Sequence, residues 1–331
     1  MPNSAVLTFT DPDAFYAAVR NAQVDGVVTA RGNFRAELTR IDLNRVWMLR
    51  GEESLARIHS VAIGNRVAIL FPTGQNPPEY VDGMELPQGR ILVFGLGSVG
   101  HQRTAAGLRW GTMSLTQEDL AAAGYAITGR VVLAPSDTCC IRPALQAMSL
   151  LSSLHEAAGH LAKTAPDILV QPEVARAIEQ SLLHAMVWCI GGGEAAETSS
   201  ALRRHAAVMR RFEQLLESNP DQTLYTAELC STVGASERTL RACCQEHLGM
   251  SPTRYLWLRR MHLARRDLRA TDTAATSVTK VATSYGFWEL GRFAVAYRSL
   301  FGESPSTTLR RPPDPQPQKN IGSPWQLPGS A

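Results

Sequence analysis

One local pattern occurs twice in the last third of the chain, and it limits how that part can fold. Residues 224–249 read LYTAELCSTVGASERTLRACCQEHLG, and residues 277–304 read SVTKVATSYGFWELGRFAVAYRSLFGES. Each segment predicts a short helix, a turn centred on a glycine (Gly234 or Gly286), and a second helix. This is the shape of a helix-turn-helix, whose second helix enters the major groove of DNA.

The second helix of the first copy has two different faces, and Ser236 is expected to cap its N-terminus. The predicted buried stripe comprises Leu240, Cys243, Cys244 and His247. The opposite face carries Arg238, Arg241 and Gln245. An arginine fork can bond O6 and N7 of guanine together. The alternative is a solvated helix face, and the recurrence of the whole unit favours DNA reading.

The second copy follows a helix predicted over residues 252–269, a rigid spacer of about 25 Å. Ser277 is expected to cap its first helix, VTKVATSY. Its last main helix is expected to pack inward through Leu290, Phe293, Ala294, Tyr297, Leu300 and Phe301. Its outward face would carry Glu289, Arg292, Val295, Ala296 and Ser299. Phosphate contacts position a protein on DNA without reading its sequence, and the predicted ones are Arg259, Lys280 and Arg298. Two such helices on one body can reach major-groove faces about 34 Å apart.

Residues 205–311 resemble the DNA-binding domain of the AraC/XylS family of transcriptional regulators. The resemblance rests on the two linked units, through SERTLRACCQEHLGMSPTRYL and KVATSYGFWELGRFAVAYRSLFGESPSTTLRR. It implies base contacts at Arg238, Thr239 and Arg241, and at Leu290, Gly291, Arg292 and Val295. Family members often have arginine where Val295 stands and a small polar residue where Gly291 stands. We therefore expect the first unit to carry most of the direct readout.

The charge distribution agrees with this division of the chain. Residues 1–200 contain 15 basic and 19 acidic residues, whereas residues 201–311 contain 17 basic and 10 acidic residues. A positive domain joined to a mildly acidic one is typical of a polyanion binder with a separate second function. Most of the six cysteines, which form no CxxC pair, are interpreted as core residues, and the alternative for the two vicinal pairs is a sensor of oxidants or thiophilic metals.

The first part of the chain predicts a different fold. A short helix is expected over residues 12–20, followed by brief β-type runs broken by turn residues. The seven predicted strands are FRAELTRI, RVWML, ARIHSVA, RVAILF, RILVFG, GLRWGTMSL and VVLAP. This spacing favours an antiparallel, cupin-like β-barrel or sandwich. The expected class is therefore multi-domain α and β, with a C-terminal all-α domain.

We expect four segments along the chain. Residues 1–141 would form a β-rich sensor domain, and residues 142–200 a helical hairpin followed by the flexible linker GGGEAAETSS. The hairpin either covers the sheet or forms a dimer interface, or does both. Residues 201–311 would form the DNA-binding domain, and the proline-rich residues 312–331 a disordered tail.

A small-molecule effector is expected in the β-rich domain, because the resembled family commonly binds one there. Candidate pocket residues, each also compatible with an ordinary surface or core position, are Arg57, His59, Phe71, His101, Arg109 and Trp110. No paired-histidine metal set, nucleophile elbow or phosphate loop is evident, and GLGSVG at 95–100 is interpreted as a turn, so neither a metal nor another cofactor is expected.

The favoured function is a ligand-responsive transcription factor that binds double-stranded promoter DNA. It would act as a cytoplasmic homodimer, with RNA polymerase as a possible partner and no membrane contact. Two alternatives remain open. One is a β-barrel enzyme with an appended DNA-binding module, and the other is a constitutive DNA-binding protein that uses its barrel only to dimerise.

Overall fold

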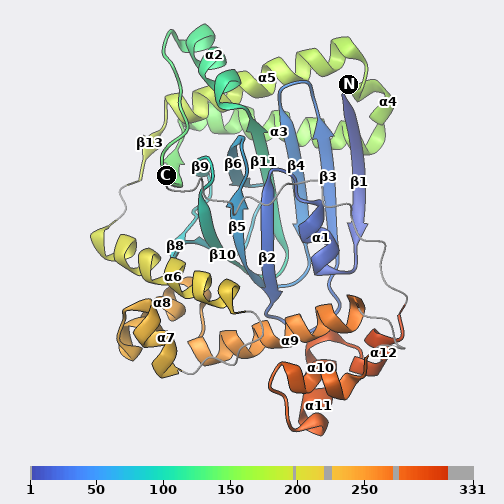
Figure 1. Ribbon diagram of the computed structural model, residues 1–331. Helices are drawn as coiled ribbons and strands as arrows, with labels where there is room; N and C mark the ends of the chain where they lie inside the picture. Colours follow the sequence, from blue (N-terminus) through green and yellow to red (C-terminus); the bar gives the residue numbers. More distant parts are fainter. Residues whose placement is uncertain (1, 197–198, 220–225, 271–275, 312–331) are drawn as a thin grey trace, which may run out of the picture.

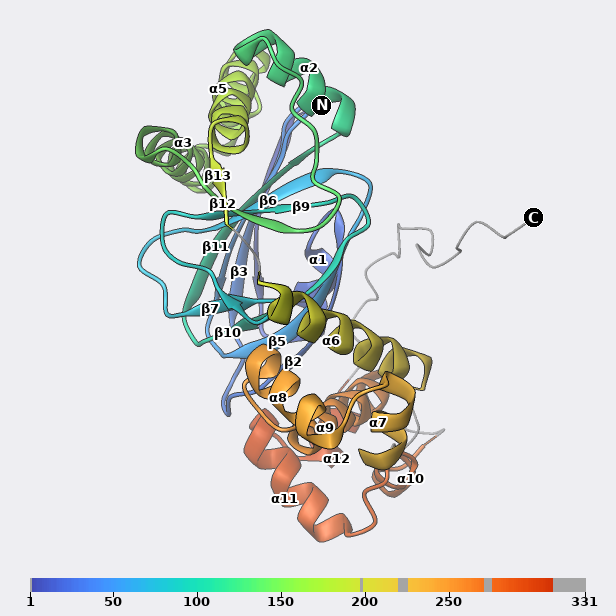
Figure 2. The same ribbon diagram turned by 90° about the vertical axis from the view of Figure 1, so that its left-hand side faces the viewer.

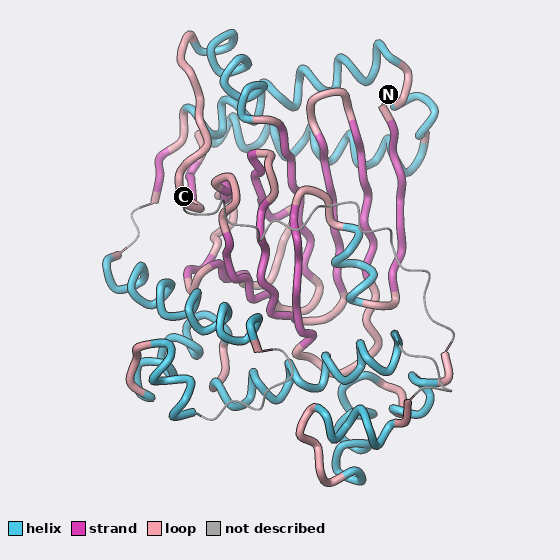
Figure 3. The backbone as a smooth tube through the Cα atoms, viewed as in Figure 1, coloured by secondary structure: helices cyan, strands magenta, loops and turns pink. Residues whose placement is uncertain are grey.

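The computed structural model describes residues 2–196, 199–219, 226–270 and 276–311, so the predicted tail lies outside the described residues. The described chain forms four successive layers (Figure 1). A helical hairpin covers a large β-sheet, a smaller sheet packs on the other side of the large one, and a helical domain closes the stack. Figure 3 shows the strands confined to the middle of the molecule, with helices on both sides.

The large sheet has eight strands in the order β1-β3-β4-β11-β6-β9-β12-β13. The strand bounds are β1 Asn3–Phe9, β3 Ala36–Asp42, β4 Trp47–Glu53, β11 Leu108–Leu115, β6 Val67–Pro72, β9 Ile91–Phe94, β12 Cys139–Arg142 and β13 Glu194–Ala195. The small sheet has five strands, β2 Ala22–Val28, β5 Arg57–Ile63, β10 Val99–Thr104, β7 Glu79–Val81 and β8 Met84–Glu85. Every described pairing is antiparallel, which confirms the predicted antiparallel sandwich.

Strand alternation separates the two faces of each sheet, because successive side chains point to opposite sides. On β11, Met113 packs in the core beneath the hairpin, whereas Trp110 and Thr112 face the small sheet. On β5, Arg57 and His59 face the large sheet, whereas Ile58 packs against the C-terminal helices. The small sheet is therefore a single layer between the interior of the sandwich and the helical domain.

Three expectations for the N-terminal part were wrong. VVLAP is not a strand, because it runs past helix α2 (Gln117–Thr128), where Val132 is buried against Gly124. GLGSVG is only partly a turn, since β10 begins at Val99. The linker GGGEAAETSS contributes the edge strand β13, paired with β12. Helix α1 (Pro12–Ala18) agrees with the predicted helix over 12–20.

The predicted helical hairpin is confirmed. Helix α3 (Leu145–Thr164) and helix α5 (Pro172–Gly191) lie side by side over the large sheet, joined by the short helix α4 (Pro166–Leu169) (Figure 1). Met148, Leu151 and Ala158 are buried. Leu145, the first residue of α3, is 89% exposed.

The C-terminal domain consists of helices only. Their bounds are α6 Ser200–Ser218, α7 Thr226–Val233, α8 Glu237–Leu248, α9 Pro252–Ala270, α10 Val278–Ser284, α11 Leu290–Phe301 and α12 Pro305–Leu309. One core joins α6, α7 and α8, and a second joins α10 and α11. Helix α9 belongs to both cores, through Tyr255 at its beginning and Leu258 to Leu268 along its length. It therefore fixes the two helix-turn-helix units relative to each other.

Candidate nucleic-acid interface and interior cavity

The first helix-turn-helix unit consists of α7, a turn and α8. Gly234 adopts a φ of +66°, a left-handed conformation that glycine takes without steric cost. The Ser236 hydroxyl accepts a hydrogen bond from the backbone N–H of Thr239, 3.1 Å away, and so caps α8. Leu240, Cys243, Cys244 and His247 are buried, as expected. Burial raises the pKa of the Cys243 thiol to about 11, consistent with a packing role.

The outer face of α8 is exposed along the predicted residues. Arg238, Arg241 and Gln245 lie at the surface, and Thr239 is half-buried beside the cap. Arg241 donates a hydrogen bond to Glu237 one turn earlier, at 2.8 Å. Such exposed pairs contribute little free energy, so Arg241 can exchange this partner for a base edge.

The second unit also has a glycine turn, but its capping serine begins the first helix, α10, and α11 has no side-chain cap. Ser277 accepts a hydrogen bond from the backbone N–H of Lys280, Gly286 adopts a φ of +74°, and Phe293 and Tyr297 are buried on the inner side of α11. The predicted outward residues of α11 are exposed or half-buried: Glu289, Gly291, Arg292, Val295, Ala296, Arg298 and Ser299. The expectation that Leu290 packs inward was wrong: it is 37% exposed, because it stands at the first position of the helix.

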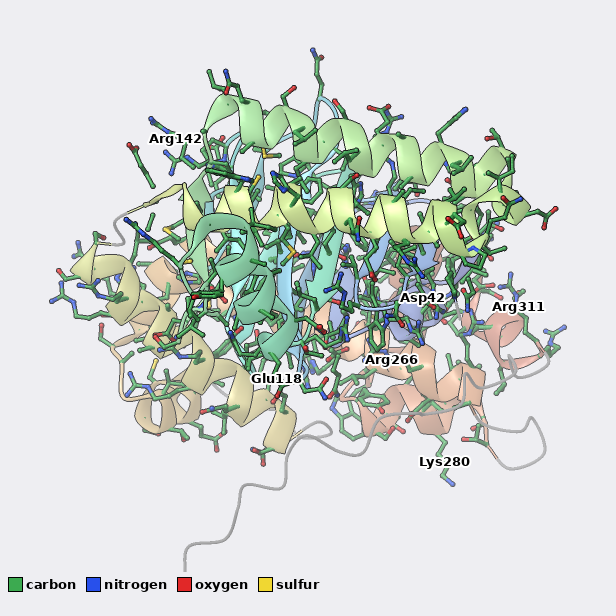
Figure 4. All side chains as sticks on the ribbon, turned by 90° about the horizontal axis from the view of Figure 1, so that it is seen from above. Asp42, Glu118, Arg142, Arg266, Lys280 and Arg311 are labelled. Atoms are coloured by element: carbon green, nitrogen blue, oxygen red, sulfur yellow. The ribbon has the colours of Figure 1, made fainter. Side chains whose placement is uncertain are left out.

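The two second helices lie on the same side of the domain. In Figure 2, α8 and α11 are on one side of α9, and α7 and α10 are on the other. Lys280 projects away from the body of the molecule (Figure 4). Arg259 is half-buried and lies close enough to Glu213 of α6 to favour its ionised form, so it faces the inside of the domain rather than this surface.

A cavity of about 60 Å³ lies between the two sheets. Three of the predicted effector residues, Arg57, His59 and Trp110, line it. Gly51 makes room for Trp110, because a Cβ at this position would lie 2.3 Å from the indole ring. The indole N–H donates to Glu53 at 2.6 Å, and Glu53 also pairs with Arg57. Burial lowers the pKa of His59 well below 6.5, so its imidazole is neutral.

The other three predicted effector residues do not reach the cavity. Phe71 lies on the opposite face of the large sheet, where its ring packs against His155 of α3 at 4.9 Å. His101 points toward the helical domain, with its Nε2 3.5 Å from Glu213. Arg109 is exposed and pairs with Glu52 at 3.0 Å. In each case the side chain points away from the cavity, because neighbouring residues on a strand point to opposite faces of the sheet.

Sequence reasoning missed several polar and aromatic residues that line the cavity: Arg20, Asn21, Trp47, Gln102, Thr112 and Ser114. A signal for two of them was present. Once Trp110 faces inward, the alternation of β11 also turns Thr112 and Ser114 inward. Gln102 had no such signal, because β10 was not expected as a strand.

The helical domain docks on the sandwich through ion pairs. Asp11 accepts from Arg265 at 2.8 Å and from Arg269 at 2.6 Å, and Arg266 pairs with Asp13 at 2.7 Å and with Asp25 at 2.6 Å. Burial opposes ionisation of Asp11, but Arg265 and Arg269 outweigh it and hold its pKa below the usual value.

A second group of contacts holds α6 and α9 to the small sheet. The Nε2 atom of His262 lies 3.1 Å from the carbonyl oxygen of Val28, and burial lowers the pKa of His262 to about 3, so its ring is neutral and donates. Glu213 of α6 lies between His101 and Arg259, and burial raises its pKa to about 7. The docked surface is thus continuous from α6 to the end of α9.

The described residues contain no group of histidine, cysteine and acidic side chains arranged to hold a metal ion. A search of the same residues finds no helix long and apolar enough to span a membrane.

The geometry defines residues 200–311 as a double helix-turn-helix, DNA-binding domain. A family model described as a helix-turn-helix domain matches residues 229–311. The chain is 41% identical over 106 residues to the probable thc operon regulatory protein of Rhodococcus erythropolis, covering 32% of each chain. It is 39% identical over 101 residues to XylDLEGF operon transcriptional activator 3 of Pseudomonas putida, covering 30% of each.

Among solved structures, the AraC-like transcriptional activator CuxR matches 79% of this chain and 95% of its own, at 14% identity and a TM-score of 0.40. The chain spans about a third of the length of the two curated relatives described above. Within the helix-turn-helix class, its C-terminal domain is similar to the regulators of the AraC/XylS family.

Proposed function

We propose that this protein is a sequence-specific transcriptional regulator that binds double-stranded DNA through α8 and α11 and responds to a small molecule held between its sheets. The observation that carries the proposal is the pair of exposed second helices on one side of α9, the first of which displays Arg238 and Arg241. Both relatives named above bear names of operon regulators.

The N-terminal domain supports the regulatory half of the proposal. Strand β10 turns Gln102 into the cavity and turns the adjacent His101 toward Glu213 of the DNA-binding domain. A ligand that moves β10 would therefore change both contacts. A ligand shifts the balance between docked and free states only if it binds the two states with different affinities. Because β10 takes part in both contacts, we expect a ligand at Gln102 to have such different affinities.

The helical hairpin supports self-association. Four large hydrophobic side chains are exposed on it, at the end of the molecule opposite the DNA-binding domain: Leu145, Leu150, Ile168 and Trp188. Leu145 and Leu150 lie in the first part of α3 and Trp188 near the end of α5, and exposed apolar groups on such helices favour a protein contact. We place a homodimer contact here, and analytical ultracentrifugation of Leu145→Glu against the wild type tests it. A variant as associated as the wild type would exclude this surface. An interaction with RNA polymerase is part of the proposed activity.

The test of DNA reading begins with selection of binding sequences from a random duplex pool by the full-length protein. Arg241→Ala is expected to relax the preference at one or two base pairs, with a loss of about 1–3 kcal/mol at those positions. Arg130→Ala, an exposed arginine of the N-terminal domain, is the control. Failure to enrich any sequence would contradict the proposed function.

The test of ligand response uses metabolites of the genes that flank the selected sites. Such a metabolite is expected to raise the melting temperature of the wild type, because it binds the native state alone. It should fail to do so for Gln102→Leu, which removes a polar group from the cavity wall. Equal stabilisation of both proteins would place the ligand elsewhere.

A further inference from the structure

The exposed large hydrophobic side chains of the C-terminal domain gather at one place. Within the described part of that domain they are Trp288, 77% exposed, Leu290, 37% exposed, and Val295, 72% exposed. Trp288 and Leu290 lie at the start of α11, and Val295 lies on its outer face. We call these three residues the apolar surface of α11. The inner side of the helix is already filled by Phe293, Tyr297 and Leu300, so packing within the domain does not explain this surface.

Gly291 lies beside this surface, and neither its backbone conformation nor its packing requires a glycine. Its φ is not positive, and a Cβ added to it would meet nothing within 4 Å. Glycine also destabilises a helix relative to alanine. A helical glycine with open space around it is explained when another molecule approaches the backbone closely at that point.

Aligning the buried residues of the two second helices shows how the units differ. Leu240 and Cys244 of α8 correspond to Phe293 and Tyr297 of α11, all four buried. Arg238 then corresponds to Gly291, and Ala242 corresponds to Val295. At equivalent positions the first unit offers a long charged side chain, and the second offers a bare backbone followed by a branched apolar group.

The charged residues near the apolar surface indicate which kind of molecule binds there. Arg292 and Arg298 are exposed on α11, three residues before and after Val295, and Glu289 pairs with Arg292 at 2.9 Å. A polyanion fits these arginines, and the apolar groups that DNA presents in its major groove are the C5 methyl groups of thymine. We propose that α11 reads thymine methyl groups through Val295 and Leu290, with Gly291 providing the clearance. This rests on the proposed DNA-binding function.

The test starts from the selected binding sequence, in which Arg241→Ala identifies the part that α8 reads. Thymines in the other part are replaced by deoxyuridine, which removes only the methyl group. Each methyl group contacted is expected to contribute about 4-fold in affinity, the value of burying one such group. The same replacement in the part read by α8 serves as the control and should change affinity much less.

The variant Val295→Ala tests whether Val295 is the side chain that contacts the thymine methyl group. It should weaken binding to thymine DNA several-fold and have little effect on uracil DNA, as expected for two groups in direct contact. Val131→Ala, at an exposed valine of the N-terminal domain, is the matched control. Gly291→Ala should keep or slightly raise the melting temperature while it weakens DNA binding.

Three outcomes would overturn the inference while the selected sequence still binds. Uracil substitution could be without effect in the second part of the site, Val295→Ala could weaken both DNAs equally, or it could weaken neither. The last result would assign the surface to a protein partner. Failure to select any sequence would instead count against the proposed function itself, so the two failures are distinct.

Discussion

At the residue scale, the least expected group is Glu79, which is buried inside the sandwich near Arg57. Neither of its carboxylate oxygens has a hydrogen-bond partner among the described residues. Burial raises its pKa to about 7, although Arg57 favours the ionised form. When folding raises the pKa of a carboxyl, its contribution to the free energy of unfolding is fully present at low pH. This contribution is lost as the pH rises through 7.

We therefore expect Glu79→Gln to flatten the pH dependence of stability. At pH 4.5 the variant should resemble the wild type, and at pH 8 it should be more stable by up to about 3 kcal/mol, since 1.36 kcal/mol corresponds to one pKa unit. Urea unfolding at the two pH values measures this. Glu85→Gln, at an exposed residue of β8, is the control. An equal difference at both pH values would mean that ionisation of Glu79 does not matter.

At the scale of elements, the Ser236 cap stabilises the first turn of α8, whereas α11 has no side-chain cap. Ser236→Ala removes the acceptor for the Thr239 N–H and should destabilise α8 by about 1 kcal/mol. DNA affinity should fall as well, since Thr239 and Arg238 stand in the first turn. Ser251→Ala, another hydroxyl before a helix, is the comparison, and thermal unfolding with gel shift gives both quantities. Unchanged affinity in Ser236→Ala would separate the cap from recognition.

The elements also show what the sequence can predict. Helices of the C-terminal domain were predictable because glycine turns, capping serines and three-and-four spacing all agree there. Strands β7 and β10 were missed, because the polar residues Glu79 and Gln102 lie at inward positions where alternation predicts apolar ones. Those residues are polar because they line or adjoin the interior cavity, so the local pattern failed closest to the candidate site.

The candidate sites divide in the same way. The exposed positions of α8 follow from helical periodicity alone, so the exposure of Arg238 and Arg241 was predictable from the sequence. The cavity depends on how two sheets face each other, and a shift of one residue moved His101 and Phe71 to the wrong side. The docking of Asp11 on Arg265 joins residues 254 positions apart, and no local signal encodes it.

At the scale of the whole molecule, Asp11 holds the two domains together while its other oxygen caps α1. Asp11→Asn keeps a capping group and removes the charge. We expect a destabilisation of about 2 kcal/mol, because Arg265 is left without its nearest acid, and faster proteolytic cleavage between the domains. Limited proteolysis and scattering measure this, with Asp137→Asn, at an exposed loop position, as the control. Cleavage as slow as in the wild type would mean that the other ion pairs suffice.

The pH dependence of docking follows from the same group. Since Arg265 and Arg269 hold the pKa of Asp11 below 3.8, its contribution is present above that pH and is lost as the pH falls through the lowered value. Scattering at pH 3 and pH 6 should therefore show a more extended molecule at the lower pH, and the difference should shrink in Asp11→Asn. An unchanged difference would show that other acids control the docking.

The period-two geometry of β10 has an evolutionary consequence. His101 and Arg103 face the helices, and Gln102 and Thr104 face the interior, so neighbouring codons govern separate surfaces. Selection can exchange Gln102 to suit a new small molecule while the contacts of His101 stay as they are. If the cavity holds the proposed ligand, the ligand contacts and the interdomain contacts of this six-residue strand can therefore change independently.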